Sequence, residues 1–235
     1  MKLRDALILL AGCSLFCGSG PAAAQDAAPT GSRISRPTAN NHANNQTISE
    51  EDRALRATQD FSRCAIYSDR AVVIEFLASY SQKLDKKVAR TIMNDGCLSH
   101  GQLMMPAETL RGGLFRQLLI DDFADQELVP ADTAVQYARY FPELESSKSR
   151  TAYLMLDFAS CVVRTDPENS RAFVTAIPGE PQEEEALKSL IPQLGPCMPD
   201  GLQVEFSKSM LTSYFAEALY REFEAAAVAQ QAKAE

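Results

Sequence analysis

The sequence predicts an all-α protein made of two tandem four-helix units that arose from an internal duplication, each unit closed by one intra-unit disulfide. Three observations lead to this prediction. Apolar residues recur at helical spacing over most of the chain beyond residue 49. Four cysteines in that region form two pairs with similar separations, and the residues around the second pair repeat those around the first. Self-similarity at a nearly constant offset is typical of repeat architectures.

Residues 1–24 have the layout of a cleaved secretory signal peptide. Lys2 and Arg4 precede an apolar stretch, and small residues precede a cleavage site after Ala24. An alternative is that the Leu-Ala-Gly-Cys sequence ending at Cys13 is a lipoprotein signal, which would make Cys13 a lipid-bearing first residue. The first interpretation predicts a periplasmic or secreted protein, and the second predicts a lipid-anchored envelope component.

Residues 25–46 form a polar spacer that is rich in asparagine and lacks aromatic residues, and we expect it to be disordered. Order is expected to begin at Thr47, because Thr47 and Glu50 have the spacing of a helix capping box. No later apolar run reaches the roughly 18 residues that a membrane helix needs. We therefore expect no transmembrane segment after signal cleavage.

The first helical unit is predicted at residues 49–126. Its third helix carries Leu84, Val88 and Ile92 on one face. Its fourth helix starts at Pro106, since proline suits the first turn of a helix. The four predicted helices cover about 49–66, 70–80, 82–93 and 106–123.

A connecting segment at residues 127–147 holds a short predicted helix at about 131–140, and the second unit follows at residues 148–231. Asp166 followed by Pro167 predicts an N-cap and a first-turn proline, at the position where the first unit has Asp69.

The four cysteines of this region are expected to form two disulfides in an oxidising compartment. Shifting the chain by 97 residues places Cys64 on Cys161, and shifting it by 100 places Cys97 on Cys197. Three connectivities are possible for four cysteines. The repeat favours Cys64 with Cys97 and Cys161 with Cys197, because a unit that once folded alone must close its own disulfide.

The sequence offers little for metal, cofactor or triad chemistry. His42 lies in the spacer, and His100 would form half of a metal site only if Cys97 were a free thiolate. Cys97 is predicted to be oxidised, and the second unit has Asp200 in place of His100. The chain also lacks a G-x-S-x-G elbow, a G-x-G-x-x-G loop and a Walker motif. We therefore expect no metal site, no cofactor and no catalytic residue of a known motif.

Carboxylates are plentiful in this acidic chain, whose formal net charge is -8. A negative protein is a poor ligand for nucleic acid and for anionic lipid. The adjacent acids Asp121 and Asp122 do not face each other across a substrate on a helix. Glu183 to Glu185 follow Pro181, where acids stabilise the first turn of a helix.

Two patterns remain that have both a structural and a functional interpretation. The pair Gly112 and Gly113 matches Thr212 and Ser213, and such small residues predict either a close helix approach or a ligand against bare backbone. Two apolar stripes at matching positions are either core or the walls of an apolar groove between the units. The stripes consist of Phe115, Leu119, Phe123, Phe215, Leu219 and Phe223.

The arrangement of signal peptide, polar spacer and two cysteine-bracketed units, with a closing helix of the form seen at residues 210–222, resembles a group of uncharacterised secreted proteins of Gram-negative bacteria. The resemblance covers about residues 49–228 and is weaker in the first unit, where residues 111–120 depart from that helix form. The resemblance implies a secreted protein with two helical units, and it implies no particular activity.

These patterns together predict a periplasmic protein that binds without catalysis, as a scaffold or as a receptor for an unknown protein or a small apolar ligand. Duplicated helical units commonly present a binding surface. One alternative is an enzyme or an enzyme inhibitor that uses a carboxylate site with no recognisable motif. The other is the lipid-anchored envelope component.

Overall fold

The computed structural model describes residues 48–80, 92, 95–97, 105–127, 129–199 and 204–234. These residues form seven α-helices and two short 3-10 helices, with no strand among them. The predicted all-α class is therefore confirmed for the described part of the chain. The predicted signal peptide, the spacer and almost all of the helix predicted at 82–93 lie outside the described residues, as do His42 and His100.

The first helix, α1 (Glu50–Ser68), begins at an N-cap that differs from the predicted one. The Ser49 hydroxyl accepts a hydrogen bond from the backbone N–H of Asp52 at 3.0 Å, so Ser49 is the N-cap instead of Thr47. Helix α1 ends at Ser68, and the next residue, Asp69, is its C-cap. The Asp69 side chain accepts a hydrogen bond from the backbone N–H of Val72 and so caps α2 (Arg70–Leu77). One aspartate thus marks the corner between two helices.

Helices α5 (Ser147–Thr165) and α6 (Pro167–Thr175) follow the same plan. Ser146 caps α5 through the backbone N–H of Ser149, and the Asp166 side chain caps α6. The predicted N-cap roles of Asp166 and the first-turn position of Pro167 are confirmed.

The remaining elements are α4 (Ala107–Phe123), α7 (Pro181–Cys197), α8 (Lys208–Ala234), η1 (Asp95–Cys97) and η2 (Tyr137–Tyr140). The predicted helix at about 131–140 is only the four-residue turn η2. Tertiary contacts explain the difference: the Tyr140 carbonyl accepts from the Tyr80 N–H at 2.7 Å, and the neighbouring Phe141 ring stacks on the Tyr80 ring. The last carbonyl of η2 therefore bonds to the segment after α2 instead of continuing a helix.

The two disulfides join the predicted cysteines. Cys64 of α1 is bonded to Cys97 of η1, and Cys161 of α5 is bonded to Cys197 at the end of α7. The Cα atoms lie 5.5 and 5.6 Å apart, as in ordinary disulfides. Disulfides of this kind are consistent with an oxidising extracytoplasmic compartment. Among the described residues, no helix is both long and apolar enough to span a bilayer.

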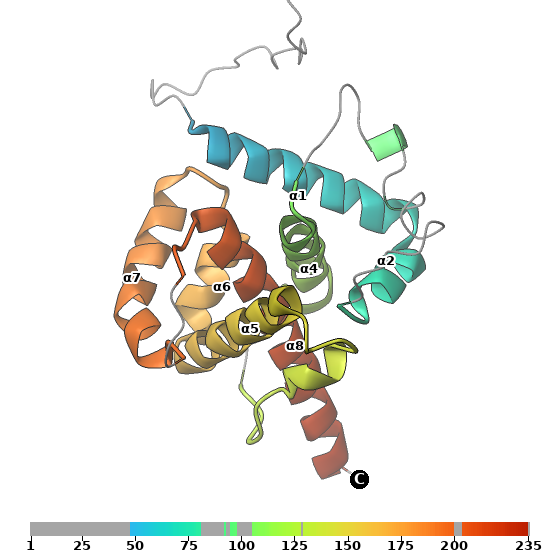
Figure 1. The fold of residues 1–235 in the computed structure, drawn as a ribbon, viewed down its shortest axis with the longest axis vertical. Helices are drawn as coiled ribbons and strands as arrows, with labels where there is room; N and C mark the ends of the chain where they lie inside the picture. The colour runs from blue at the N-terminus through green and yellow to red at the C-terminus, as the bar shows by residue number, and fades with distance from the viewer. Residues whose placement is uncertain are drawn as a thin grey trace, which may run out of the picture. The chain divides into compact units, whose positions relative to one another are not determined.

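Helices α4 and α8 form the most extensive helix-helix interface, with α1 packed on α4 and α5 packed on α8 (Figure 1). One continuous apolar core contains side chains from all seven described helices. Phe115 of α4 illustrates this, since its ring centroid lies 5.5 Å from that of Tyr220 in α8. The two predicted units thus contribute to the same core.

Candidate functional site

The two apolar stripes lie on the central helices α4 and α8 and belong to the core. Five of the six side chains are at most 3% exposed, and Phe123 is half-buried. The Phe123 and Phe223 rings stack with centroids 4.8 Å apart. Their burial agrees with the core interpretation of the stripes.

The glycine pair in α4 marks two close helix contacts. A Cβ atom on Gly112 would lie 2.3 Å from the Cα atom of Ser213 in α8, and one on Gly113 would lie 2.5 Å from the Ser62 hydroxyl in α1. The predicted close helix approach is therefore confirmed. Ser213 of α8 covers the backbone of Gly112. A ligand therefore has no room to bind against that backbone, as the alternative interpretation required.

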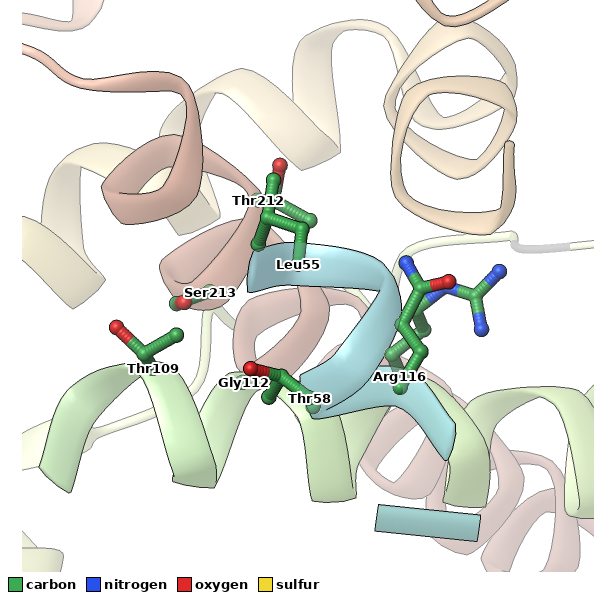
Figure 2. A pocket seen from close by; sticks show the side chains of 9 residues that line it. Leu55, Thr58, Thr109, Gly112, Arg116, Thr212 and Ser213 are labelled. Atoms are coloured by element: carbon green, nitrogen blue, oxygen red, sulfur yellow. The ribbon is translucent and has the colours of Figure 1, made fainter. Parts of the chain in front are cut away.

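A small crevice opens where α1, α4 and α8 meet (Figure 2). Thr109 and Ser213 lie beside Gly112, and Arg116 lies at the opposite end of the crevice. The space accessible to a water-sized molecule is about 10 Å³, which is room for about one water molecule. The crevice is lined by Leu55, Thr58, Gln59, Thr109, Gly112, Gly113, Arg116, Thr212 and Ser213.

Three of the four hydroxyl groups around this crevice, those of Thr58, Thr212 and Ser213, donate to carbonyls of their own helices. Thr58 donates to the carbonyl of Ala54, and Thr212 donates to that of Lys208. The crevice is therefore a packing defect between three helices, too small for an organic ligand.

The most buried charged cluster joins α2, α4 and α8. Arg111 and Glu217 form an ion pair at 2.9 Å, and their side chains are only 5% and 2% exposed. The Tyr80 hydroxyl donates to the other oxygen of Glu217 at 2.5 Å. The Arg111 guanidinium also lies over the Tyr80 ring, 3.9 Å from its centroid. Both partners of the buried pair thus have further polar or aromatic contacts.

Arg111 also holds the end of α2. Its guanidinium donates to the carbonyls of Phe76, Leu77 and Ser79 at 3.1 to 3.3 Å. Arg221 of α8 donates to the same Leu77 carbonyl at 2.8 Å. Cations stabilise the carbonyl end of a helix because the helix dipole is negative there. This cluster therefore fixes α2 against the central pair of helices.

Two side chains of this cluster, Tyr80 and Arg111, have pKa values far above neutral pH. Burial raises the pKa of Tyr80, and the neighbouring Glu217 carboxylate raises it further, so the tyrosine stays a hydrogen-bond donor. Burial alone would lower the pKa of Arg111, but Glu217 outweighs that effect and raises it. A general acid or base works best with a pKa near the operating pH. Neither side chain is suited to that role.

A second buried acid lies one turn further along α8. Glu222 is fully buried, accepts from the Ser160 hydroxyl at 2.7 Å and pairs with Arg164 at 2.8 Å. Arg164 donates at the same time to the Ala131 carbonyl. Burial and then Glu222 raise the pKa of the nearby Tyr137 phenol. This cluster attaches α5 and the 127–147 segment to α8.

A third cluster lies at the start of α8. Lys208 pairs with Asp52 of α1 and with Glu183 of α7, the latter at 2.8 Å. Burial tends to raise the pKa of Asp52, but hydrogen bonds from Lys208 and Ser49 outweigh it and lower that pKa. Burial tends to lower the pKa of Lys208, and its bonds to the two carboxylates raise it instead. The acids predicted to support the first turn of α7 thus include one, Glu183, whose partner Lys208 joins α7 and α1 to α8.

Arg116 and Arg171 hold the ends of each other's helices. Arg116 of α4 donates to the carbonyls of Val174 and Thr175 at the end of α6, both at 2.8 Å. Arg171 of α6 donates to the carbonyls of Phe123 and Ala124 at the end of α4. Burial chiefly, and then repulsion from Arg63, lower the pKa of Arg116 to about 10. Arg116 thus remains positively charged at neutral pH.

The described part of the chain brings each of its buried acids to a cation, and Asp52 and Glu183 share one, Lys208. Each of the four buried acids, Asp52, Glu183, Glu217 and Glu222, pairs with a lysine or arginine. No three side chains of the metal-binding types converge within the described ranges. Cys97, one half of the metal site considered above, is bonded to Cys64.

The adjacent acids of α4 share one cation, Arg70, which lies 3.9 Å from the Asp121 carboxylate and also binds Asp122. Asp122 binds Arg70 at 2.6 Å and accepts from the Tyr220 hydroxyl at 3.0 Å. Asp121 accepts from Gln117 of its own helix at 2.8 Å. The two carboxylates do not form a pair facing one substrate.

Sequence reasoning did not identify the three ion-pair clusters. A signal for them is present in α4 and α8, where Arg111, Arg116, Glu217, Arg221 and Glu222 interrupt otherwise apolar or small residues. Buried charges are rare unless they are paired, so charged residues in a fully buried helix predict such pairs.

Comparisons with family models, with curated proteins and with solved structures find no match to this chain.

Proposed function

We propose that this chain is an extracytoplasmic helical-repeat protein that acts by non-covalent binding, as a scaffold or adaptor for a protein partner. The single observation that carries the proposal is that the buried acids form ion pairs between helices, which gives them a structural role. Each buried acid of the described residues links two helices through a lysine or arginine. This leaves recognition to the surface of the molecule.

A protein partner is favoured over a small apolar ligand by the packing of the interior. The stripes that would line an apolar groove are part of the core, and the crevice among α1, α4 and α8 has room for about one water molecule. Binding sites for drug-sized ligands are far larger, about 300 Å³ or more.

We also propose that the scaffold arose by duplication of one four-helix unit. Helices α1 and α5 have the same length of 19 residues, and their N-caps Ser49 and Ser146 are 97 residues apart. The corner residues Asp69 and Asp166 have the same offset and similar backbone angles. Each half closes one disulfide from its first helix, which supports the same descent.

A capture experiment tests the binding proposal. The full chain, produced with its leader and carrying a C-terminal tag, is recovered from a periplasmic extract after mild crosslinking, and native mass spectrometry measures retained small molecules. We expect to recover a crosslinked partner protein of defined mass. We also expect the mass of the chain in native mass spectrometry to equal the mass of its sequence, which means that no small molecule is retained. A variant with all four disulfide cysteines replaced by serine serves as the control for capture by unfolded chain. Recovery of neither partner nor ligand under several growth conditions contradicts the proposal.

Sequencing the mature N-terminus distinguishes the lipid-anchored alternative. Gln25 as the first residue supports the cleaved, unanchored protein, and a modified Cys13 supports the anchored one. The enzyme and inhibitor alternative requires acidic side chains that converge in a concave pocket, and the crevice among α1, α4 and α8 is lined by no aspartate or glutamate.

A further inference from the structure

The two ends of α7 are anchored in different ways. Its first half packs into the core through Glu183, Ala186 and Leu190. The last seven residues, 191–197, bury no side chain fully, and only Leu194 and Cys197 among them contact the core with part of their surface. Figure 1 shows α7 on the outside of the helical array. Core packing therefore holds α7 firmly only as far as Leu190.

The backbone of this end is also a weak helix. Pro192 and Pro196 lie inside α7, and each lacks the N–H that an interior residue donates to the preceding turn. Gly195 lies between them with nothing within 4 Å of its side-chain position, so no contact compensates for its flexibility. Residues 191–197 thus combine missing backbone hydrogen bonds with a high loss of chain entropy on folding.

The Cys161–Cys197 disulfide is the covalent constraint on this end, in addition to the partial core contact of Leu194. It joins the last residue of α7 to α5, which is buried in the core along one face. Cys161 is an exposed residue and Cys197 is half-buried, so a reductant can reach the bond from solvent. Thiol-disulfide exchange depends on this access.

We propose that Cys161–Cys197 is a redox-sensitive clasp: the disulfide holds residues 191–199, and its reduction releases that segment while the rest of the fold persists. The reductant is a dithiol. One of its thiolates attacks Sγ of Cys161, the bond to Cys197 breaks, and the Cys197 thiolate takes up a proton. The second thiol then resolves the mixed disulfide, which leaves two protein thiols and a cyclic oxidised dithiol, so that two electrons and two protons have been transferred. Release increases the exposure of Leu194 and Met198, which now contact the core.

Hydrogen exchange followed by mass spectrometry tests the clasp on the full chain. Amide exchange is compared between the oxidised protein and the Cys161→Ser/Cys197→Ser variant at the same pH. We expect amides in residues 191–199 to exchange at least tenfold faster in the variant, and amides in residues 181–190 and 210–222 to change by less than twofold. Treatment of the wild-type chain with dithiothreitol is expected to give the same local change.

Two further variants decide whether the clasp acts through this weak end of α7. Adding Pro192→Ala and Pro196→Ala to the serine variant restores two backbone donors and is expected to slow exchange in 191–199 again. The Cys64→Ser/Cys97→Ser variant is the matched control and is expected to leave that segment unchanged. Equal exchange of 191–199 with and without the Cys161–Cys197 bond overturns the proposal. Faster exchange spread over the whole of α5, α7 and α8 also overturns it, because the bond would then support the entire fold.

Discussion

Replacing Gly112 by alanine tests whether α4 and α8 are held at the distance that a glycine permits. The new Cβ would lie 2.3 Å from the Cα atom of Ser213, whereas ordinary contacts begin at 3.4 Å, so the helices must separate locally by about 1.1 Å. A gap of that size removes a substantial part of the dispersion energy of the atoms that lose contact. The clash is with backbone, so a rotamer change cannot relieve it.

The expected size of the effect follows from two opposing terms. Overpacking of a core costs about 1 to 3 kcal/mol, and the upper value applies here because α4 and α8 form the most extensive interface. Alanine gains about 1 kcal/mol over glycine in a helix interior. We therefore expect Gly112→Ala to lower the free energy of unfolding by about 2 kcal/mol, and the Tm by about 4 to 8 °C for a chain of this size.

Urea denaturation followed by circular dichroism measures the change, with Gly195→Ala as the matched control. Gly195 is also helical, but nothing lies within 4 Å of its side-chain position, so alanine there should be neutral or stabilise by up to about 1 kcal/mol. Adding Ser213→Gly to Gly112→Ala should restore only part of the loss, since the Ser213 Cα atom remains. If Gly112→Ala is as stable as the wild type, the close approach of the two helices is refuted.

Two further predictions concern the buried charges. Glu217→Gln leaves Arg111 buried without its counter-charge and should lower the free energy of unfolding, measured by urea denaturation, by about 3 to 5 kcal/mol. The double variant Glu217→Gln/Arg111→Met should recover much of that loss. Equal instability of the single and the double variant contradicts this account. Because the pKa of Asp52 is lower in the folded protein than its ordinary value of 3.8, this carboxylate stabilises the fold above about pH 4, and its contribution disappears as the pH falls through the lowered pKa. Asp52→Asn should therefore be less stable than the wild type at pH 7 and show a smaller loss of stability between pH 5 and pH 2.5, measured by thermal unfolding; an unchanged difference across that range contradicts the assignment.

Features of the fold that depend on nearby residues are predictable from the sequence. Asp69 and Asp166 cap helices that start at the next residue, and capping involves atoms only three residues away. The misplaced cap at Thr47 and the overlong helix at 131–140 show the limit of such reasoning. Ser49 and Thr47 both carry hydroxyls that suit a cap, and the end of η2 is determined by its contact with Tyr80, which lies far away in the chain.

The candidate site was less predictable because its contacts are long-range. Arg111 and Glu217 are 106 residues apart, and Lys208 and Asp52 are 156 residues apart. Periodicity assigns an apolar or polar face to a helix, but it does not say which charged residue of one helix meets which residue of another. The stripes at Phe115 and Phe215 illustrate this, since their spacing favours a core position but is also compatible with the wall of a groove.

The sequence by itself determined the all-α class, the corners at the two aspartates, and the pairing of Cys64 with Cys97 and Cys161 with Cys197. Each of these depends on local hydrogen bonding, on periodicity or on comparison of one half of the chain with the other. Only the tertiary structure decided that α4 and α8 pack through Gly112, that the buried acids are paired with cations, and that α7 has no fully buried side chain after Leu190. These features follow from distances between segments that are remote in the chain, and such distances are set by the packing of the whole core.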